Sequence, residues 1–195
     1  IIGFYGVDNP PAESLDYVSD MLHIMGSFIV SSIRRRNLLR QLERMSYRDQ
    51  LTQFGNRYAV DWFVEHEWNG EQIGVVYCDI TGLKKVNDEQ GHEAGDRLII
   101  RACECLAGVF KGYGLYRIGG DEFLVLCLGI EEKDLREHVE KLRMDMKEHQ
   151  VTMAVGMIWK EHGPKDIDLL LNESERLMYE DKDRYYKKHG LKRRR

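Results

Sequence analysis

The run Arg-Ile-Gly-Gly-Asp-Glu-Phe at residues 117–123 constrains this chain more than any other stretch. Apolar runs at 115–116 and 123–128 flank it, and each predicts a β-strand. Two adjacent glycines, Gly119 and Gly120, can adopt positive φ angles without the penalty that a Cβ atom brings. We therefore expect a tight hairpin whose turn is built on these two glycines.

Carboxylates gather around this hairpin. Asp121 and Glu122 follow the glycines, at a turn where acids gain nothing from packing. Asp79 ends an apolar run at 73–78 that is typical of a central strand covered on both faces. If these strands are neighbours, three carboxylates meet at one edge of the sheet, where a cation must neutralise them. An all-oxygen ligand set favours Mg²⁺ or Mn²⁺. The alternative is a surface hairpin without a ligand.

The turn at 81–84 follows Asp79 and leads into a predicted helix. Gly82 leaves the amides of this turn, including that of Leu83, free to bind phosphate, and Lys84 adds positive charge. Lys182, late in the last predicted helix, could reach the same edge; the alternative is an ordinary surface lysine. Because Mg²⁺ held by few carboxylates usually shares its shell with substrate phosphates, the pattern points to phosphoryl or nucleotidyl transfer.

Strands and helices alternate along the chain. Hydrophobic periodicity predicts helices at 56–67, 83–89, 94–109, 131–149 and 167–186, and a last strand at 151–158. Around the hairpin, this order gives an α/β fold whose four- to five-stranded sheet has βαββαβ character and is flanked by helices.

A long helix is predicted at 14–45, with apolar residues at three- and four-residue spacing in one narrow stripe. Its length suits a two-chain coiled coil, whereas its first half could instead pack on a domain of its own chain. Residues 1–7 read as the last strand of such a domain, and the chain begins with Ile. We therefore expect a fragment that lacks its true N-terminus.

Net charge, apolar stretches and cysteine spacing limit which partners and which cellular compartment the chain can have. The net charge of -4 gives no basic field for nucleic acid, and the longest apolar stretch, at 21–30, is too short to span a bilayer. The four cysteines lack the C-x-x-C spacing of a metal site. We therefore expect a cytoplasmic protein, with no nucleic acid partner and no membrane partner in this fragment.

Four motifs in order resemble those of the GGDEF domain, the diguanylate cyclase family, over residues 49 to about 186. Residues 1–48 resemble, more weakly, the C-terminal tail of a GAF-type sensor domain with its linker helix. The expected domains are therefore 1–48 and 49–195, the second with a nucleotidyl cyclase or palm-like core. The four motifs are Gly-Gly-Asp-Glu-Phe at 119–123, Asp-x-Leu-Thr at 49–52 with Asn-Arg at 56–57, the strand, loop and helix signature at 79–96, and the closing elements at 151–156 and 178–182.

The resemblance implies that two such domains, each holding one GTP, face each other as a homodimer and condense the two GTP into cyclic di-GMP and two pyrophosphates. The N-terminal helix would clamp the dimer, and an upstream sensor domain in the same chain would regulate it. Asp79, Asp121 and the Ile80 carbonyl correspond to the metal ligands. Glu122 corresponds to the acid near the attacking 3′-hydroxyl, as a metal ligand or a base.

The resemblance also implies how the nucleotide is bound. Asn87 and Asp96 correspond to the guanine readers, and a carboxylate can accept hydrogen bonds from the N1–H and 2-amino groups that adenine lacks. The other contacts would come from the backbone of Gly119, Gly120, Gly82 and Leu83 and from the ammonium groups of Lys84 and Lys182.

Two departures from the family pattern concern the metal and phosphate positions. Thr81 stands where a second aspartate is often found. Tyr186 occupies the slot of a phosphate-binding arginine, although Arg184 could substitute. Two alternatives to a cyclase therefore stay open: a non-catalytic domain that binds GTP or cyclic di-GMP, and a metal-dependent phosphodiesterase or nuclease.

Overall fold

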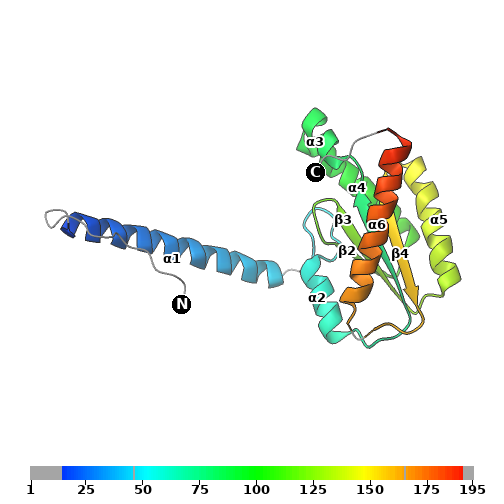
Figure 1. The fold of residues 1–195 in the computed structure, drawn as a ribbon, viewed down its shortest axis with the longest axis horizontal. Helices are drawn as coiled ribbons and strands as arrows, with labels where there is room; N and C mark the ends of the chain where they lie inside the picture. Colours follow the sequence, from blue (N-terminus) through cyan, green and yellow to red (C-terminus); the bar gives the residue numbers. More distant parts are fainter. Residues whose placement is uncertain (1–14, 46, 165, 191–195) are drawn as a thin grey trace. The chain divides into compact units, whose positions relative to one another are not determined.

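The computed structural model describes residues 15–45, 47–164 and 166–190 of the chain. The chain divides into two compact units, residues 1–46 and 47–195. In its described part the first unit is a single long helix, α1 (Leu15–Met45), as the sequence predicts (Figure 1). The strand predicted at residues 1–7 lies outside the described residues.

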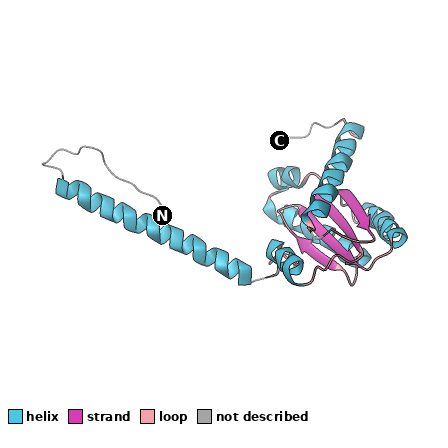
Figure 2. Cartoon of the chain, turned by 60° about the horizontal axis from the view of Figure 1, so that its bottom comes forward, coloured by secondary structure: helices cyan, strands magenta, loops and turns pink. Residues whose placement is uncertain are grey.

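The second unit is built on a four-stranded sheet in which every neighbouring pair is antiparallel (Figure 2). The strand order is β2-β3-β1-β4, so the apolar run that the sequence marks as central does lie inside the sheet. All eight residues of β1 are buried. The strands are β1 (Ile73–Ile80), β2 (Gly114–Arg117), β3 (Glu122–Leu128) and β4 (Met153–Lys160).

Helices cover both faces of this sheet, which confirms the predicted α/β architecture (Figure 2). Side chains of α4 and α5 pack with Val76 and Cys78 of β1 on one face. Side chains of α2 and α6 pack with Val75 and Tyr77 on the other, because successive strand residues point to opposite faces. The helices are α2 (Arg57–His66), α3 (Leu83–Gln90), α4 (His92–Val109), α5 (Glu132–Glu148) and α6 (Asp168–Lys188).

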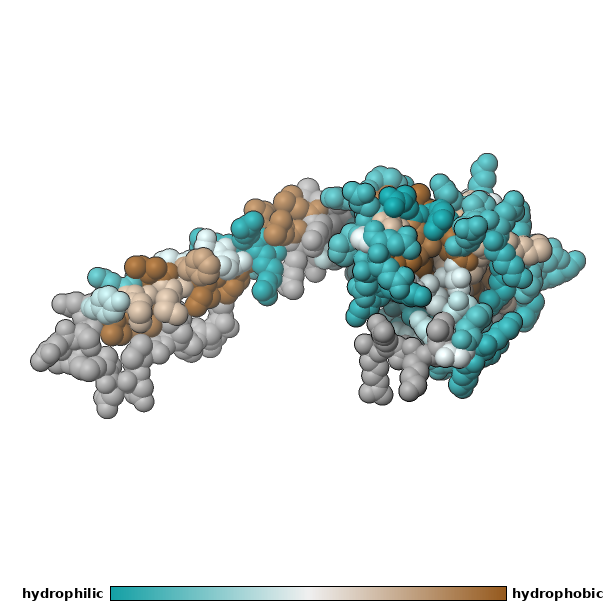
Figure 3. Space-filling view, turned by 90° about the horizontal axis from the view of Figure 1, so that it is seen from above, coloured by the Kyte–Doolittle hydropathy of each residue, from teal (hydrophilic) through white to brown (hydrophobic). Residues whose placement is uncertain are grey.

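Helix α1 exposes much of its apolar surface. Ile24 is 71% exposed and Phe28 74% exposed, and Leu38, Leu39 and Leu42 each keep more than half of their surface exposed. Figure 3 shows apolar side chains along the face of this helix that is in view. Large contiguous apolar surface is characteristic of interaction sites. No described helix is both long and apolar enough to cross a bilayer.

The hairpin between β2 and β3 uses its glycines differently from the prediction. Neither Gly119 nor Gly120 has a positive φ angle, so that expectation is wrong. A Cβ atom on Gly119 would instead lie 2.5 Å from Oε2 of Glu122. The Arg117 guanidinium donates to the Gly120 carbonyl at 2.7 Å, which holds the connection closed. At residue 119 the Glu122 side chain approaches closely, so an added Cβ atom there would make the Glu122 carboxylate shift.

Helix α6 is docked on edge strand β4 with no space between them. A Cβ atom on Gly156 would lie 2.0 Å from the Ser174 carbonyl oxygen and 2.3 Å from the Met178 nitrogen, both in the α6 backbone. At the same edge the Val155 N–H donates to the Asp181 carboxylate at 3.0 Å. The absence of a side chain at Gly156 thus sets how closely α6 packs on β4, and the hydrogen bond from Val155 to Asp181 sets its register along the strand.

Replacing Gly156 with alanine should lower the free energy of unfolding by about 3 kcal/mol, because backbone atoms of α6 cannot move aside as a flexible side chain can. Gly108 in α4 is the matched control, since an added Cβ there meets nothing within 4 Å. Gly108→Ala should raise the free energy of unfolding by roughly 0.5–1 kcal/mol. Urea denaturation measures both variants, and equal effects at the two glycines would contradict the tight contact.

Candidate functional site

Three acids are neighbours where β1 ends and β3 begins. The β1–β3 register places Asp79 directly opposite Glu122. The Ile80 N–H donates to the Asp121 carbonyl at 2.9 Å, which ties the hairpin turn to the end of β1. The structure therefore places the three acidic residues at the one edge where the sequence analysis expected them.

Asp79 is the most buried of the three acids, with only 4% of its surface exposed. The Lys182 ammonium lies 2.6 Å from Asp79 Oδ1, and its side chain is itself only 14% exposed. Lys182 is thus not an ordinary surface lysine, and that alternative is wrong. Through this contact α6 supplies positive charge to the acid edge.

Glu122 is held in an unfavourable electrostatic environment. Burial raises the pKa of its carboxyl, and the neighbouring charges of Asp121, Asp79 and Glu175 raise it further, while Arg57 acts in the opposite direction. The sequence analysis missed Glu175, and it named Arg57 in a motif without placing it at this edge. Both act on Glu122 from helices outside the hairpin, Glu175 from α6 and Arg57 from α2.

The donor set fits a hard divalent cation. Asp79, Asp121 and Glu122 are neighbours beside the backbone of Ile80, and the charges of Asp121 and Asp79 add to the effect of burial in raising the pKa of Glu122. Their carboxylate oxygens do not all lie within 4.8 Å of one another, so a bound ion would have to draw them together. Mg²⁺ and Mn²⁺ prefer such oxygen ligands. The residues present therefore fit the metal that the sequence analysis expected.

The turn after β1 has the form of an anion site. Gly82 has a φ of 89° and precedes α3, whose first-turn amides receive no side-chain cap from it. Leu83 is buried and anchors the turn, whereas Lys84 is exposed on the first turn of α3. The Thr81 hydroxyl is buried and finds no hydrogen-bond partner among the described residues. Free amides at a helix N-terminus suit a phosphate group.

Asn87 and Asp96 are carried by two helices that pack together, α3 and α4. The Asn87 amide oxygen is buried and has no hydrogen-bond partner within the described part of the chain. A Cβ atom on Gly95 would lie 1.9 Å from that oxygen, so glycine is required there. Asp96 follows directly and is exposed. An unpaired buried amide is costly, which favours a ligand donor at this position.

A clamp behind the hairpin was not foreseen from the sequence. Asp49 Oδ1 accepts hydrogen bonds from the Thr52 N–H at 2.9 Å, from the Thr52 hydroxyl at 2.7 Å and from Arg117 at 3.1 Å. Burial alone would raise the pKa of Asp49, but these hydrogen bonds outweigh it and lower the pKa. Since Arg117 also holds the Gly120 carbonyl, the clamp fixes the turn that carries Asp121.

Arg184 is engaged away from the acid edge. Its guanidinium pairs with Asp181 at 3.2 Å, and Asp181 also pairs with Arg143 of α5. A cleft of about 640 Å³ lies on this side of α6, lined by α5, the start of β4 and the end of α6. Its lining includes Arg184 and Asp181 but none of the three edge carboxylates. In this structure Arg184 therefore does not replace the missing phosphate-binding arginine.

A family model described as "Diguanylate cyclase, GGDEF domain" matches residues 46–188. Among curated proteins, the chain is 29% identical to the bifunctional diguanylate cyclase/cyclic di-GMP phosphodiesterase MucR of Pseudomonas aeruginosa, over 80% of this chain and 25% of MucR. It is 26% identical to the diguanylate cyclase DgcP of Escherichia coli, over 83% of this chain and 54% of DgcP. The chain thus spans about a quarter to about half of the length of these relatives.

Among solved structures, the chain is similar to the coiled coil and GGDEF domain of DgcB from Caulobacter crescentus in complex with c-di-GMP. The TM-score is 0.63 at 20% identity, and the match covers 88% of this chain and 96% of DgcB's. At this identity the likeness shows a shared fold.

Glu122→Gln should stabilise the protein at pH 7 in the absence of divalent cations. Because the pKa of Glu122 in the folded state is raised above 4.5, its ordinary value, the folded protein holds this proton more tightly than the unfolded chain does. Ionisation at higher pH therefore costs stability, and the glutamine variant avoids that cost. The advantage should disappear as the pH falls below the ordinary value, where the wild-type carboxyl is protonated in both states.

Urea midpoints across this pH range provide the measurement. The control is Glu173→Gln, which removes an exposed carboxylate from the same helix, α6, that carries Glu175. It should leave the midpoint nearly unchanged at every pH. A wild type as stable as the Glu122 variant at pH 7 would contradict the repulsion among the edge acids.

Proposed function

Because this chain belongs to the GGDEF diguanylate cyclase family, we propose that it condenses two GTP into cyclic di-GMP and two pyrophosphates, as the output domain of a signalling protein. The observation that carries the proposal is the acid edge, where Asp79 and Glu122 lie opposite each other and Lys182 of α6 pairs with Asp79. Its ligands suit a divalent cation, and its lysine suits a phosphate chain.

In the proposed mechanism Asp79, Asp121 and the Ile80 carbonyl hold Mg²⁺ or Mn²⁺. A bound divalent ion would neutralise phosphate charge and act as a Lewis acid. Glu122, as a further ligand or as the base, lies near the attacking 3′-hydroxyl of GTP. Its raised pKa makes it a better proton acceptor than an ordinary carboxylate.

The other site residues would bind and orient GTP. Asn87 and Asp96 would recognise the guanine. The buried Asn87 amide oxygen has no donor among the described residues, so it could accept a hydrogen bond from the base. The triphosphate would lie over the turn after β1 and along the open hairpin backbone. Its contacts are the amides of Gly82 and Leu83, the backbone of Gly119 and Gly120, and the ammonium groups of Lys84 and Lys182.

We propose that two chains assemble through α1 so that their two GTP sites face each other, since one domain holds one GTP and the product needs two. The exposed apolar stripe of α1 supports this role. An upstream sensor domain would act on the same helix. The proposed compartment is the cytoplasm, because all four cysteines are free thiols and are buried.

The second candidate is a non-catalytic domain that binds GTP or cyclic di-GMP and regulates a partner. One observation favours it: Tyr186 stands in the slot of the phosphate-binding arginine, and Arg184 is held by Asp181. Such a domain would bind nucleotide without turnover.

Incubation of the whole chain with GTP and Mg²⁺ should yield cyclic di-GMP and pyrophosphate, resolved by chromatography. ATP should give no cyclic product, because Asp96 facing adenine would lack its donors. Asp121→Ala should reduce turnover at least about a hundredfold with an unchanged thermal midpoint, since this side chain serves a cation and not the core. Asp61→Ala, an exposed acid of α2, is the control. Nucleotide binding without any product would favour the regulatory domain.

Specific activity should rise with protein concentration until the dimer is saturated. Replacing Met25 and Ile29, which lie opposite Ser27 and Ser31 on the helix, with glutamate should shift this dependence to at least about tenfold higher concentration, because two charges would be buried in the α1 contact. Glutamate at Ser27 and Ser31 is the matched control on the same turns. Sedimentation and activity are measured on each variant. A rate independent of concentration in a monomeric chain would contradict the proposed assembly.

A further inference from the structure

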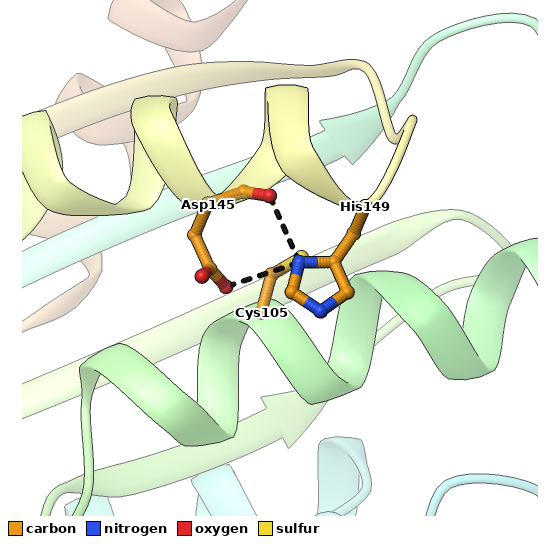
Figure 4. A group of neighbouring side chains, drawn as sticks. All are labelled: Cys105, Asp145 and His149. Atoms are coloured by element: carbon orange, nitrogen blue, oxygen red, sulfur yellow. Dashed lines mark hydrogen bonds and ion pairs between the residues drawn. The ribbon is translucent and has the colours of Figure 1, made fainter.

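Three side chains of different chemistry meet on the face of the sheet opposite Lys182. Cys105 comes from α4, Asp145 from the last turn of α5, and His149 from the residue that follows α5 (Figure 4). One ligand atom of each residue lies within 4.8 Å of those of the other two. The acid edge does not use this cluster, and no motif in the sequence includes it.

Helix geometry accounts for the convergence. Asp145 and His149 are four residues apart, so they lie on the same side of the end of α5. Cys105 belongs to the buried stripe of α4 that packs against α5, and none of its surface is exposed. The side chains of His149 and Asp145 are 40% and 27% exposed. The cluster therefore has a dry floor formed by the thiol and a side open to solvent.

We propose that Cys105, Asp145 and His149 form a three-ligand site for a zinc-class divalent transition metal, with a fourth coordination position open to water. A sulfur, a nitrogen and an oxygen donor suit Zn²⁺ and its spectroscopic substitute Co²⁺, and they do not suit Mg²⁺. A thiolate and a carboxylate balance the charge of a divalent ion, so the filled site would be neutral.

The arrangement without metal is a hydrogen-bonded end to α5. His149 Nδ1 lies 3.0 Å from the Asp145 carbonyl oxygen and 3.7 Å from its carboxylate, as the dashed lines in Figure 4 show. Burial raises the pKa of the Cys105 thiol to about 12, helped by the charge of Asp145 and a hydrogen bond to it. The thiol is therefore protonated until a cation displaces the proton.

Metal binding needs only local movement. Zinc bonds of roughly 2.0–2.3 Å place tetrahedral ligand atoms about 3.3–3.8 Å apart. The three ligand atoms now lie within 4.8 Å of one another. Rotation of the partly exposed side chains of His149 and Asp145 would shorten these distances to the range for zinc. Nδ1 becomes a ligand when the imidazole proton moves to Nε2, and the thiol proton is released to solvent.

The site lies beside a connection that reaches the phosphate turn. After His149, Gln150 adopts a φ of 55°, and the Val151 N–H closes the end of α5 by donating to the Met146 carbonyl at 2.8 Å. The Thr152 carbonyl then accepts from the Thr81 N–H at 2.8 Å, at the start of the turn that holds Gly82. A metal that joins α4 to the end of α5 would stiffen this connection.

Cobalt titration of the whole chain tests the proposal, with excess Mg²⁺ present to occupy the acid edge. We expect a thiolate-to-cobalt charge-transfer band that saturates at one equivalent and is lost when Zn²⁺ is added. Cys105→Ala should abolish the band, and His149→Ala should weaken binding at least about tenfold. Cys103→Ala is the matched control, because it removes another buried thiol of α4 and should leave the titration unchanged.

Zn²⁺ should also raise the thermal midpoint of the wild type and of Cys103→Ala, but not that of His149→Ala. Circular dichroism shows whether each variant is folded. If Cys105→Ala does not fold, the half-exposed His149 still decides the outcome. The proposal is overturned if cobalt gives no charge-transfer band with the wild type, or if the band survives the loss of His149 and disappears with Cys103.

Discussion

The site depends first on the ion pair between Asp79 and Lys182. Removing a carboxylate from water costs several kcal/mol unless a cation compensates it, and Asp79 is almost completely buried at the end of β1. The compensating ammonium lies 103 residues further along the chain. Helix α6 must therefore be docked before the acid edge can form.

Much of this arrangement follows from the sequence, because it rests on patterns within single elements. The unbroken apolar run of β1 implied a strand covered on both faces, and the acids at its end and in the hairpin implied a common edge. The reason for the hairpin glycines was wrong. A local argument considers backbone freedom alone, whereas in the structure Gly119 has no positive φ angle and lies close to the Glu122 side chain three residues away.

What escaped prediction depends on packing between elements distant in sequence. Arg57 and Glu175 act on Glu122 from two helices that lie on the same face of the sheet. Cys105 and His149 come together only through the packing of α4 on α5. The cysteine spacing argued against a metal site because it considers cysteines alone, and a ligand set that mixes sulfur, nitrogen and oxygen leaves no such spacing.

The close contact at Gly156 has a consequence for how sequence variation in this protein is interpreted. The position touches no proposed ligand, yet any side chain there would push α6 outward and carry Lys182 away from Asp79. A survey of random variants scored by activity would rank Gly156 among the catalytic positions. The exposed Lys84, which is proposed to touch phosphate, would tolerate more exchanges. A position in such a domain that tolerates no substitution can therefore mark close packing between a helix and the sheet, and it need not mark a residue that takes part in the reaction.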